Sequence, residues 1–265
     1  MNKVFLNLKV VLVAVMVGLF VVSCSDDDSN NTSAVDITQE DVMKSLEVEK
    51  ISNFIDDMTL DNISMNRSSS EISSKIGKPG CADFSITDTG YTLTFTDCTN
   101  EDGETISGAI NVSVVMENNT VTTTITFDNL SYAGNSVNGS KSTTYSIDTD
   151  AGNFVYAVTS DLSITLADGT TASEQGTKTY TINGFGSGDA SYTIGGSWIV
   201  TLGSDSYSLA TDPTLAGTFS CGYITSGTLV MTKNALSASI DYGDGTCDNK
   251  ATVTYPDGTT EEIEL

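Results

Sequence analysis

The segment Phe154-Val-Tyr-Ala-Val-Thr-Ser-Asp-Leu-Ser-Ile-Thr-Leu-Ala-Asp-Gly169 indicates most directly how this chain folds. Its apolar residues fall on every second position in two runs: Phe154, Tyr156 and Val158, then Leu162, Ile164 and Leu166. A period of two is typical of β-structure with one face in a core and the other in water. The Asp168-Gly169 pair that follows favours the positive φ angles of a tight hairpin. The segment therefore predicts half-buried β-structure that turns back into an antiparallel partner.

The same alternation recurs from Cys81 to the end of the chain. It is carried by Tyr91, Leu93 and Phe95; Ile106, Ile110, Val112, Val114 and Met116; Val121, Ile125 and Phe127; Trp198, Val200 and Leu202; and Ala251, Val253 and Tyr255. Short turn pairs punctuate the region: Thr89-Gly90, Asp102-Gly103, Asn118-Asn119, Asn138-Gly139, Asp244-Gly245 and Asp257-Gly258. Such connections are too short for the crossover helices that parallel strands need. Residues 80–265 are therefore predicted to form one mainly β domain, an extended antiparallel up-and-down β-meander.

Residues 36–66, which precede the strands, have the pattern of an amphipathic helix. Thr38 and Asp41 match a capping box at its start. Apolar residues recur at spacings of three to five along it: Val42, Leu46, Ile51, Ile55 and Met58. We expect this N-terminal helix to pack on the β domain through its apolar face; a helix that binds a partner is the alternative. Residues 67–79 read as a polar, Ser-rich linker.

The first 23 residues have the features of a cleaved signal peptide. Lys3 and Lys9 make a short basic start, and Val10–Val22 is an unbroken run of thirteen apolar residues and glycine. That run suits the core of a secretory signal, and it is shorter than the roughly 20 residues of a membrane span. With Ser23 and Cys24 it resembles a bacterial lipobox, which implies cleavage before Cys24 and acylation of its thiol by chains such as palmitate. The alternatives are an ordinary signal peptide with an incidental cysteine, or a membrane anchor.

An acidic run follows the cysteine directly. Ser25, Asp26, Asp27 and Asp28 resemble the export signal of surface-exposed lipoproteins of Bacteroidetes. The alternative is a solvated spacer, because aspartates of this kind do not pack in a core. Residues 24–35 are then a lipidated flexible tether. Two or more acyl chains hold a protein stably, at ~0.8 kcal/mol per buried methylene. The expected location is the outer membrane, lipid-anchored, at the cell surface.

Segments of the β region carry a family resemblance. They are Pro79-Gly-Cys-Ala-Asp-Phe84, Thr92-Leu-Thr-Phe-Thr-Asp-Cys98, Ile106-Ser-Gly108 and Asp241-Tyr-Gly-Asp-Gly-Thr-Cys-Asp-Asn-Lys-Ala-Thr-Val253. The chain resembles a group of uncharacterised Bacteroidetes lipoproteins over most of its mature length. The resemblance implies an acidic helix, a threonine-rich β region with paired cysteines, and a surface location. It implies no activity.

Four cysteines remain once Cys24 is assigned to the lipid: Cys81, Cys98, Cys221 and Cys247. An exported protein lies where disulfides persist. Four cysteines allow three connectivities, and we favour Cys81–Cys98 with Cys221–Cys247 because each pair brackets a predicted hairpin or short meander. A tetrathiolate metal site is the alternative, although the chain has no C-x₂-C pair among these cysteines.

Charge and composition exclude several classes of function. Lys and Arg number 11 and Asp and Glu 35; without residues 1–23, which hold Lys3 and Lys9 and no acid, the charge is 9 − 35 = −26. Such a surface repels nucleic acid and anionic headgroups. The chain has no histidine, which excludes Ser-His-Asp and Cys-His catalysis and histidine-ligated zinc. A carboxylate-only mechanism and calcium remain compatible with it.

Two sets of residues are candidates for a site. Asp241, Asp244 and Asp248 lie close together around a glycine turn and could supply oxygen ligands to calcium; the alternative is that they only shape turns. Trp198, the single tryptophan, could be an aromatic platform for a sugar. Its alternation with Val200 and Leu202 favours a core position instead. No catalytic residue and no cofactor is nominated.

The function expected from these features is that of a non-enzymatic surface lipoprotein, a structural or interaction module. Its partners would be the membrane, through the lipid anchor, and a glycan or an envelope protein. One alternative is a glycan-binding lipoprotein associated with polysaccharide uptake. Another is a periplasmic carrier whose open sheet holds a lipid, and a carboxylate hydrolase is the last.

Overall fold

One helix and fourteen β-strands make up the described part of the chain, which is a mainly β protein as predicted. The computed structural model describes residues 36–65, 81–99, 103–117, 120–148, 153–184 and 190–265, and these belong to one compact unit, Val35–Leu265. The helix is α1 (Gln39–Met65). The strands are β1 (Ala82–Ile86), β2 (Gly90–Thr99), β3 (Thr105–Glu117), β4 (Thr120–Tyr132), β5 (Asn135–Asp148), β6 (Asn153–Thr165), β7 (Thr171–Asn183), β8 (Ser191–Leu202), β9 (Asp205–Thr211), β10 (Leu215–Thr218), β11 (Ile224–Lys233), β12 (Leu236–Asp244), β13 (Lys250–Thr254) and β14 (Thr260–Glu264).

The strands form one antiparallel sheet in nearly sequential order, which confirms the predicted meander. The exception is the position between β8 and β11, which two short strands share. β9 pairs with the second half of β8 and β10 with its first half, and both also pair with β11. The break between them falls at Asp212-Pro213, where proline has no N–H to continue the ladder. β1 and β14 are the two ends of the strand order.

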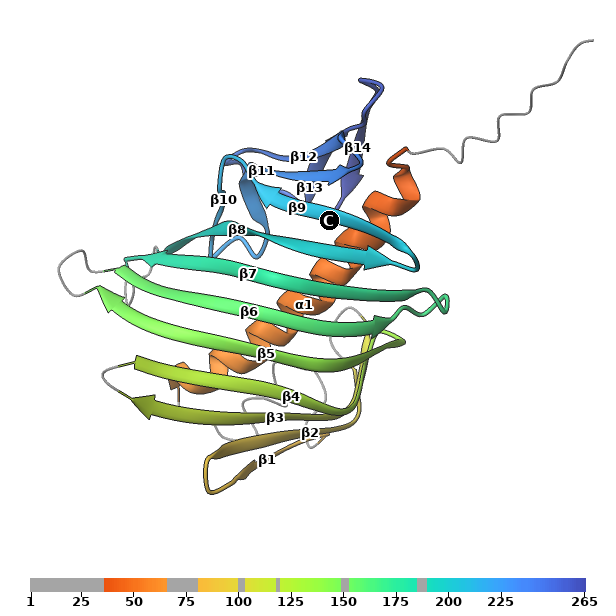
Figure 1. The fold of residues 1–265 in the computed structure, drawn as a ribbon. Helices are drawn as coiled ribbons and strands as arrows, with labels where there is room; N and C mark the ends of the chain where they lie inside the picture. Colours follow the sequence, from red (N-terminus) through yellow and green to blue (C-terminus); the bar gives the residue numbers. More distant parts are fainter. Residues whose placement is uncertain (1–35, 66–80, 100–102, 118–119, 149–152, 185–189) are drawn as a thin grey trace, which may run out of the picture. The chain divides into compact units, whose positions relative to one another are not determined.

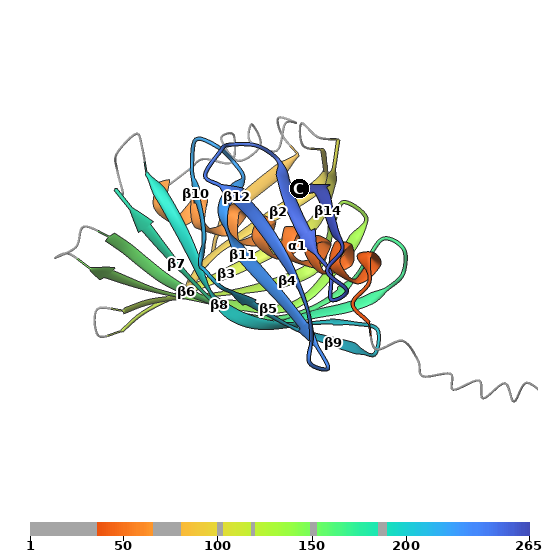
Figure 2. The same cartoon turned by 90° about the horizontal axis from the view of Figure 1, so that it is seen from above.

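The sheet curls around α1, which runs obliquely across one of its faces (Figures 1 and 2). We call this the inner face. The predicted alternation is confirmed there, because fully buried apolar residues on many strands point into one core with the helix: Leu93, Ile110, Ile125, Leu162, Val200, Leu229 and Val253. Serines and threonines occupy many of the intervening positions. The helix therefore fills the inner face, so the sheet does not rely on a second sheet to cover its apolar side.

Most of the turn predictions that fall on described residues are confirmed. Asp168-Gly169 joins β6 to β7, and Asp257-Gly258 joins β13 to β14. Asn138-Gly139 is not a turn: both residues lie inside β5, paired with Ser163 and Leu162 of β6. Gly139 has a φ of 103° and lies beside a register shift between β4 and β5. Asp102 and Asn118-Asn119 are outside the described residues.

Two Ser-Gly pairs mark bulges at corresponding places in the sheet. Gly108 in β3 and Gly227 in β11 both have a φ of 98°. In each case the register with the next strand shifts across the glycine. A β-carbon on Gly108 would lie 2.2 Å from the Asn129 carbonyl oxygen. Glycine is therefore required by both the left-handed backbone and the close approach of the neighbouring strand.

Both predicted disulfides are present. Cys81 is bonded to Cys98, which ties the start of β1 to β2, and Cys221 is bonded to Cys247, which ties the β10–β11 loop to the turn after β12. The bonds close loops with sequence separations of 17 and 26 residues. In the chain-entropy description each stabilises the fold by about 3 kcal/mol. The tetrathiolate alternative is thereby excluded.

Candidate functional site

Helix α1 buries polar side chains among its apolar ones. Glu49, Ser52 and Asp56 follow one another at spacings of three and four, so they share a side of the helix. All three are buried, as are Val48 and Ile55 beside them. The prediction of a purely apolar packing face was therefore incomplete. Because the sheet curls around α1, it covers part of the helix surface that the sequence pattern assigned to water.

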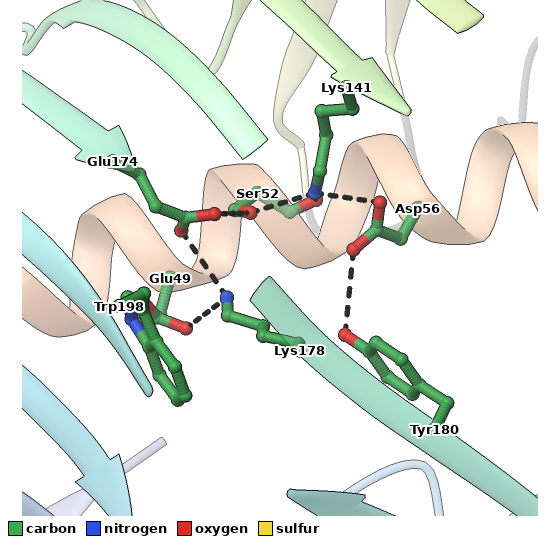
Figure 3. Close-up of polar contacts among 8 residues, drawn as sticks. All are labelled: Glu49, Ser52, Asp56, Lys141, Glu174, Lys178, Tyr180 and Trp198. Atoms are coloured by element: carbon green, nitrogen blue, oxygen red, sulfur yellow. Dashed lines mark hydrogen bonds and ion pairs between the residues drawn. The ribbon is translucent and has the colours of Figure 1, made fainter. Parts of the chain in front are cut away.

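The sheet supplies the partners of these helix residues from its inner face. Lys141 comes from β5, Glu174, Lys178 and Tyr180 from β7, and Trp198 from β8 (Figure 3). On β7, residues 174, 178 and 180 alternate with exposed or half-exposed neighbours, so the strand period directs all three toward the helix. We call the eight residues Glu49, Ser52, Asp56, Lys141, Glu174, Lys178, Tyr180 and Trp198 the polar cluster.

Lys178 links the helix to β7 and β8. Its Nζ lies 2.6 Å from Glu49 Oε2 and 3.3 Å from Glu174 Oε2. The same ammonium lies 4.5 Å from the centroid of the Trp198 ring, in a cation–π contact. Trp198 Nε1 in turn donates a hydrogen bond to Glu49 Oε1. One lysine thus serves two carboxylates and one aromatic face.

Lys141 organises the other half of the polar cluster. Its Nζ lies 2.6 Å from Asp56 Oδ1 and donates to the Ser52 carbonyl oxygen at 2.9 Å and to Ser52 Oγ at 2.8 Å. Ser52 Oγ donates to Glu174 Oε1 at 2.8 Å, and Tyr180 donates to Asp56 Oδ2 at 3.5 Å. Ser52 therefore joins the Lys141 half to the Lys178 half, and the cluster is one connected network.

The polar cluster contains three carboxylates and two ammonium groups in a buried place. Burial raises the pKa of Glu49 to about 7, because the attraction of Lys178 only partly offsets desolvation and the charge of Glu174. Burial likewise raises the pKa of Asp56 against the attraction of Lys141. Burial acts on Glu174 as well, but Lys178, Lys141 and hydrogen bonds from Ser160 and Ser52 outweigh it and lower its pKa to about 2. The two helix acids therefore hold protons more readily than the sheet acid.

This arrangement binds the helix to the sheet and offers little to a substrate. The charged side chains of the cluster are between 0% and 11% exposed. Each of the five contacts an opposite charge at 3.3 Å or less. Catalytic acids need to reach a substrate within hydrogen-bonding distance, and these cannot do so while α1 is in place.

The residues that the sequence suggested as site candidates lie in the core or within turns. Trp198 is 3% exposed, so its role as an exposed ligand platform is wrong, and the core alternative is correct. Asp241 accepts from Gly243 N, Asp244 from Thr246 N, and Asp248 from Lys250 N, each within its own turn. Among the described residues, no group of three acidic, cysteine or histidine side chains is placed to hold a metal ion.

The nominated anchor and export residues, Cys24, Ser25, Asp26, Asp27 and Asp28, lie outside the described residues. So does the predicted linker, residues 67–79. Within the described ranges, no helix combines the length and the apolar character needed to cross a bilayer.

A small group of exposed aromatic side chains lies at the β10–β11 loop. Phe219 is 60% exposed and Tyr223 41% exposed. The Phe219 ring lies 5.3 Å from the half-buried ring of Tyr192, and the Tyr192 hydroxyl donates to the Tyr223 carbonyl oxygen at 3.4 Å. The Cys221–Cys247 disulfide holds the loop that carries two of them. We call Tyr192, Phe219 and Tyr223 the aromatic patch.

Comparisons with protein-family models, with curated proteins and with solved structures found no match to this chain. A function for this protein is therefore inferred from the geometry of the polar cluster and of the aromatic patch.

Proposed function

We propose that this protein is a lipid-anchored, non-enzymatic module of the cell envelope, held by Cys24 and presenting the outer face of its sheet to partners. The observation that carries this proposal is the occupancy of the inner face. The helix fills it, and the five charged groups that could do acid–base chemistry there are buried in ion pairs.

The same observation weighs against the two internal-site alternatives. A lipid carrier needs an apolar space on the inner face, where this chain has α1 and a network of charges (Figure 3). A carboxylate hydrolase needs an acid and a base open to substrate, whereas Glu49, Asp56 and Glu174 are engaged with lysines. Hydrolytic turnover that disappears on one carboxylate substitution would contradict the proposal.

The anchor is tested by mass spectrometry of the N-terminal peptide of the native protein. We expect the mature chain to begin at an acylated Cys24 and to partition into detergent, because two or more acyl chains give stable membrane attachment. Cys24→Ala should leave the protein unacylated and in the aqueous phase. Met116→Ala, which changes an exposed residue of β3 and leaves every cysteine in place, is the control and should keep the lipid. An unmodified Cys24 thiol, or a mature chain that begins elsewhere, rules out the anchor.

Glycan binding is a second candidate, and the aromatic patch favours it. Exposed aromatic rings on a disulfide-held loop offer apolar faces to a sugar, with the hydroxyls of Thr218 and Ser220 beside them. The strongly negative surface favours a neutral glycan over an acidic one.

A glycan array tests this candidate with the full chain. We expect binding to a neutral polysaccharide that Phe219→Ala weakens at least tenfold, since the ring is 60% exposed and lies against Tyr192. Met116→Ala is the matched control, because Met116 is 78% exposed on β3, outside the patch. The absence of binding to every glycan, or equal loss in both variants, excludes the aromatic patch as a sugar site.

A further inference from the structure

The polar cluster holds one more carboxylate than it has ammonium groups. Glu49, Asp56 and Glu174 face Lys141 and Lys178, so the fully ionised cluster has a net charge of −1. An unbalanced charge in a buried site is strongly unfavourable, and such sites respond by changing protonation. The helix and the sheet therefore fit together best when the cluster holds one proton.

The contacts assign this proton to Glu49. Asp56 is paired with Lys141 at 2.6 Å. Glu174 receives Lys178 and the Ser52 hydroxyl. Glu49 shares Lys178 with Glu174, and its other oxygen accepts a hydrogen bond from the neutral indole of Trp198. An uncharged carboxyl group can keep that indole contact.

The ionisable groups that surround Glu49 in the described part of the chain are themselves buried. Asp56 lies on the same helix; the sheet contributes Lys141 from β5, Glu174, Lys178 and Tyr180 from β7, and Tyr242 from β12. Burial raises the pKa of Tyr180 and of Tyr242, so neither hydroxyl ionises near neutral pH. Burial lowers the pKa of Lys178, but the attraction of Glu174 and Glu49 outweighs it and raises that pKa. Lys178 therefore stays charged. Asp56 has Lys141 at 2.6 Å, whereas Glu49 shares Lys178 with Glu174. Glu49 is therefore the acid that we expect to titrate between pH 5 and 8.

We propose that α1 docks on the inner face as a proton-linked element: Glu49 carries a proton when the helix is seated, and raising the pH from 5 to 8 loosens the helix from the sheet. This inference concerns the helix–sheet interface and does not depend on the proposed function.

The direction follows from linkage. The pKa of Glu49 is about 7 in the folded protein against an ordinary value of 4.5, so the folded state binds the proton more tightly than the unfolded state. The stabilisation is complete below pH 4.5 and is lost as the pH rises toward 7 and above. Between pH 5 and 8 the unfolding equilibrium constant should rise on the order of 50-fold from this group alone. Glu174, whose pKa is about 2, does not titrate in this window.

The experiment compares the full chain with Glu49→Gln by urea unfolding at several pH values from 5 to 8. Trp198 is the only tryptophan in the chain and contacts Glu49, so its fluorescence reports on this site. The ratio of the wild-type to the E49Q unfolding constant should rise about 50-fold across the window. Glu262→Gln is the control, because it removes an acid from an exposed pair with Lys250. The ratio of the wild-type to the E262Q unfolding constant should not change with pH.

Hydrogen exchange of the α1 peptides provides a second measurement. In wild type, protection of α1 should fall with rising pH, after correction for intrinsic exchange, more than protection of β5 and β6; in E49Q it should not. Glu174→Gln balances the charges at two and two, so it should move the titration to lower pH. A wild-type profile identical to that of E49Q overturns the proposal. If Asp56→Asn and not E49Q flattens the profile, the assignment to Glu49 is wrong.

Discussion

Replacing Lys178 with methionine is expected to lower the free energy of unfolding by about 3–5 kcal/mol, the usual effect of breaking a buried ion pair from one side. Lys178 is 3% exposed and contacts two carboxylates, Glu49 and Glu174. Methionine keeps much of the side-chain volume and removes the charge. The drop in the free energy of unfolding therefore reports the cost of burying Glu49 and Glu174 without the ammonium group of Lys178. The measurement is urea or thermal unfolding at neutral pH; the midpoint temperature should fall by roughly 10 °C.

Lys250→Met is the matched control for that variant. Lys250 makes an ion pair of the same length, 2.6 Å, with Glu262, but the two side chains are 49% and 63% exposed. Exposed pairs contribute about 0–1 kcal/mol, so this variant should be nearly neutral. Acidification should also partly restore K178M, because protonation removes the charge that Lys178 balanced. Equal losses in the two lysine variants would show that the polar cluster contributes no more than a surface pair.

Local patterns were sufficient to predict the architecture from the sequence. The period of two identified inner-face positions such as Leu93 and Val200, which are buried. The capping box at Thr38 and Asp41 marked the start of α1, where the Asp41 carboxylate accepts from Thr38 N at 2.9 Å. The disulfide pairing followed from cysteines that bracket neighbouring strands. Each of these predictions depends on interactions between residues close in sequence, which is why a single amino-acid sequence was enough to make them.

The polar cluster was missed because its partners are far apart in sequence. Ser52 and Glu174 are separated by 122 positions, and Glu49 and Trp198 by 149. A signal was nevertheless present: Lys178 and Glu174 occupy the same parity as the buried Tyr180 in β7. A charge at a core position of a strand indicates a buried partner of opposite charge. The sequence could therefore have predicted that a buried ion pair exists, but not that the helix supplies its other half.

The Asn138-Gly139 pair shows a different limit of sequence reasoning. This dipeptide is a strong hairpin signal because glycine readily adopts positive φ. In this chain the positive φ of Gly139 serves an irregular point inside β5. Glycine within a strand can also mark a bulge or a close approach of another backbone. Local sequence does not distinguish these uses, since they differ only in what the neighbouring strand does.

Gly139→Ala is therefore expected to destabilise the protein by about 3–4 kcal/mol. A β-carbon there would lie 2.1 Å from the Asp161 carbonyl oxygen on β6. That oxygen belongs to the backbone of a central strand, so it cannot rotate away as a side chain could. The left-handed φ of 103° adds about 1–2 kcal/mol for a residue with a β-carbon, and overpacking against the neighbouring strand adds about 1–3 kcal/mol.

Gly169→Ala separates the two contributions. Gly169 has a φ of 87°, yet a β-carbon there would meet no atom within 4 Å, so it should show the backbone term alone, about 1–2 kcal/mol. Both variants are compared with wild type by urea unfolding at one pH. If Gly139→Ala is no more destabilising than Gly169→Ala, β5 and β6 do not approach each other as closely as the structure has them. A larger loss at Gly139 means that this glycine is required by the neighbouring strand rather than by a turn.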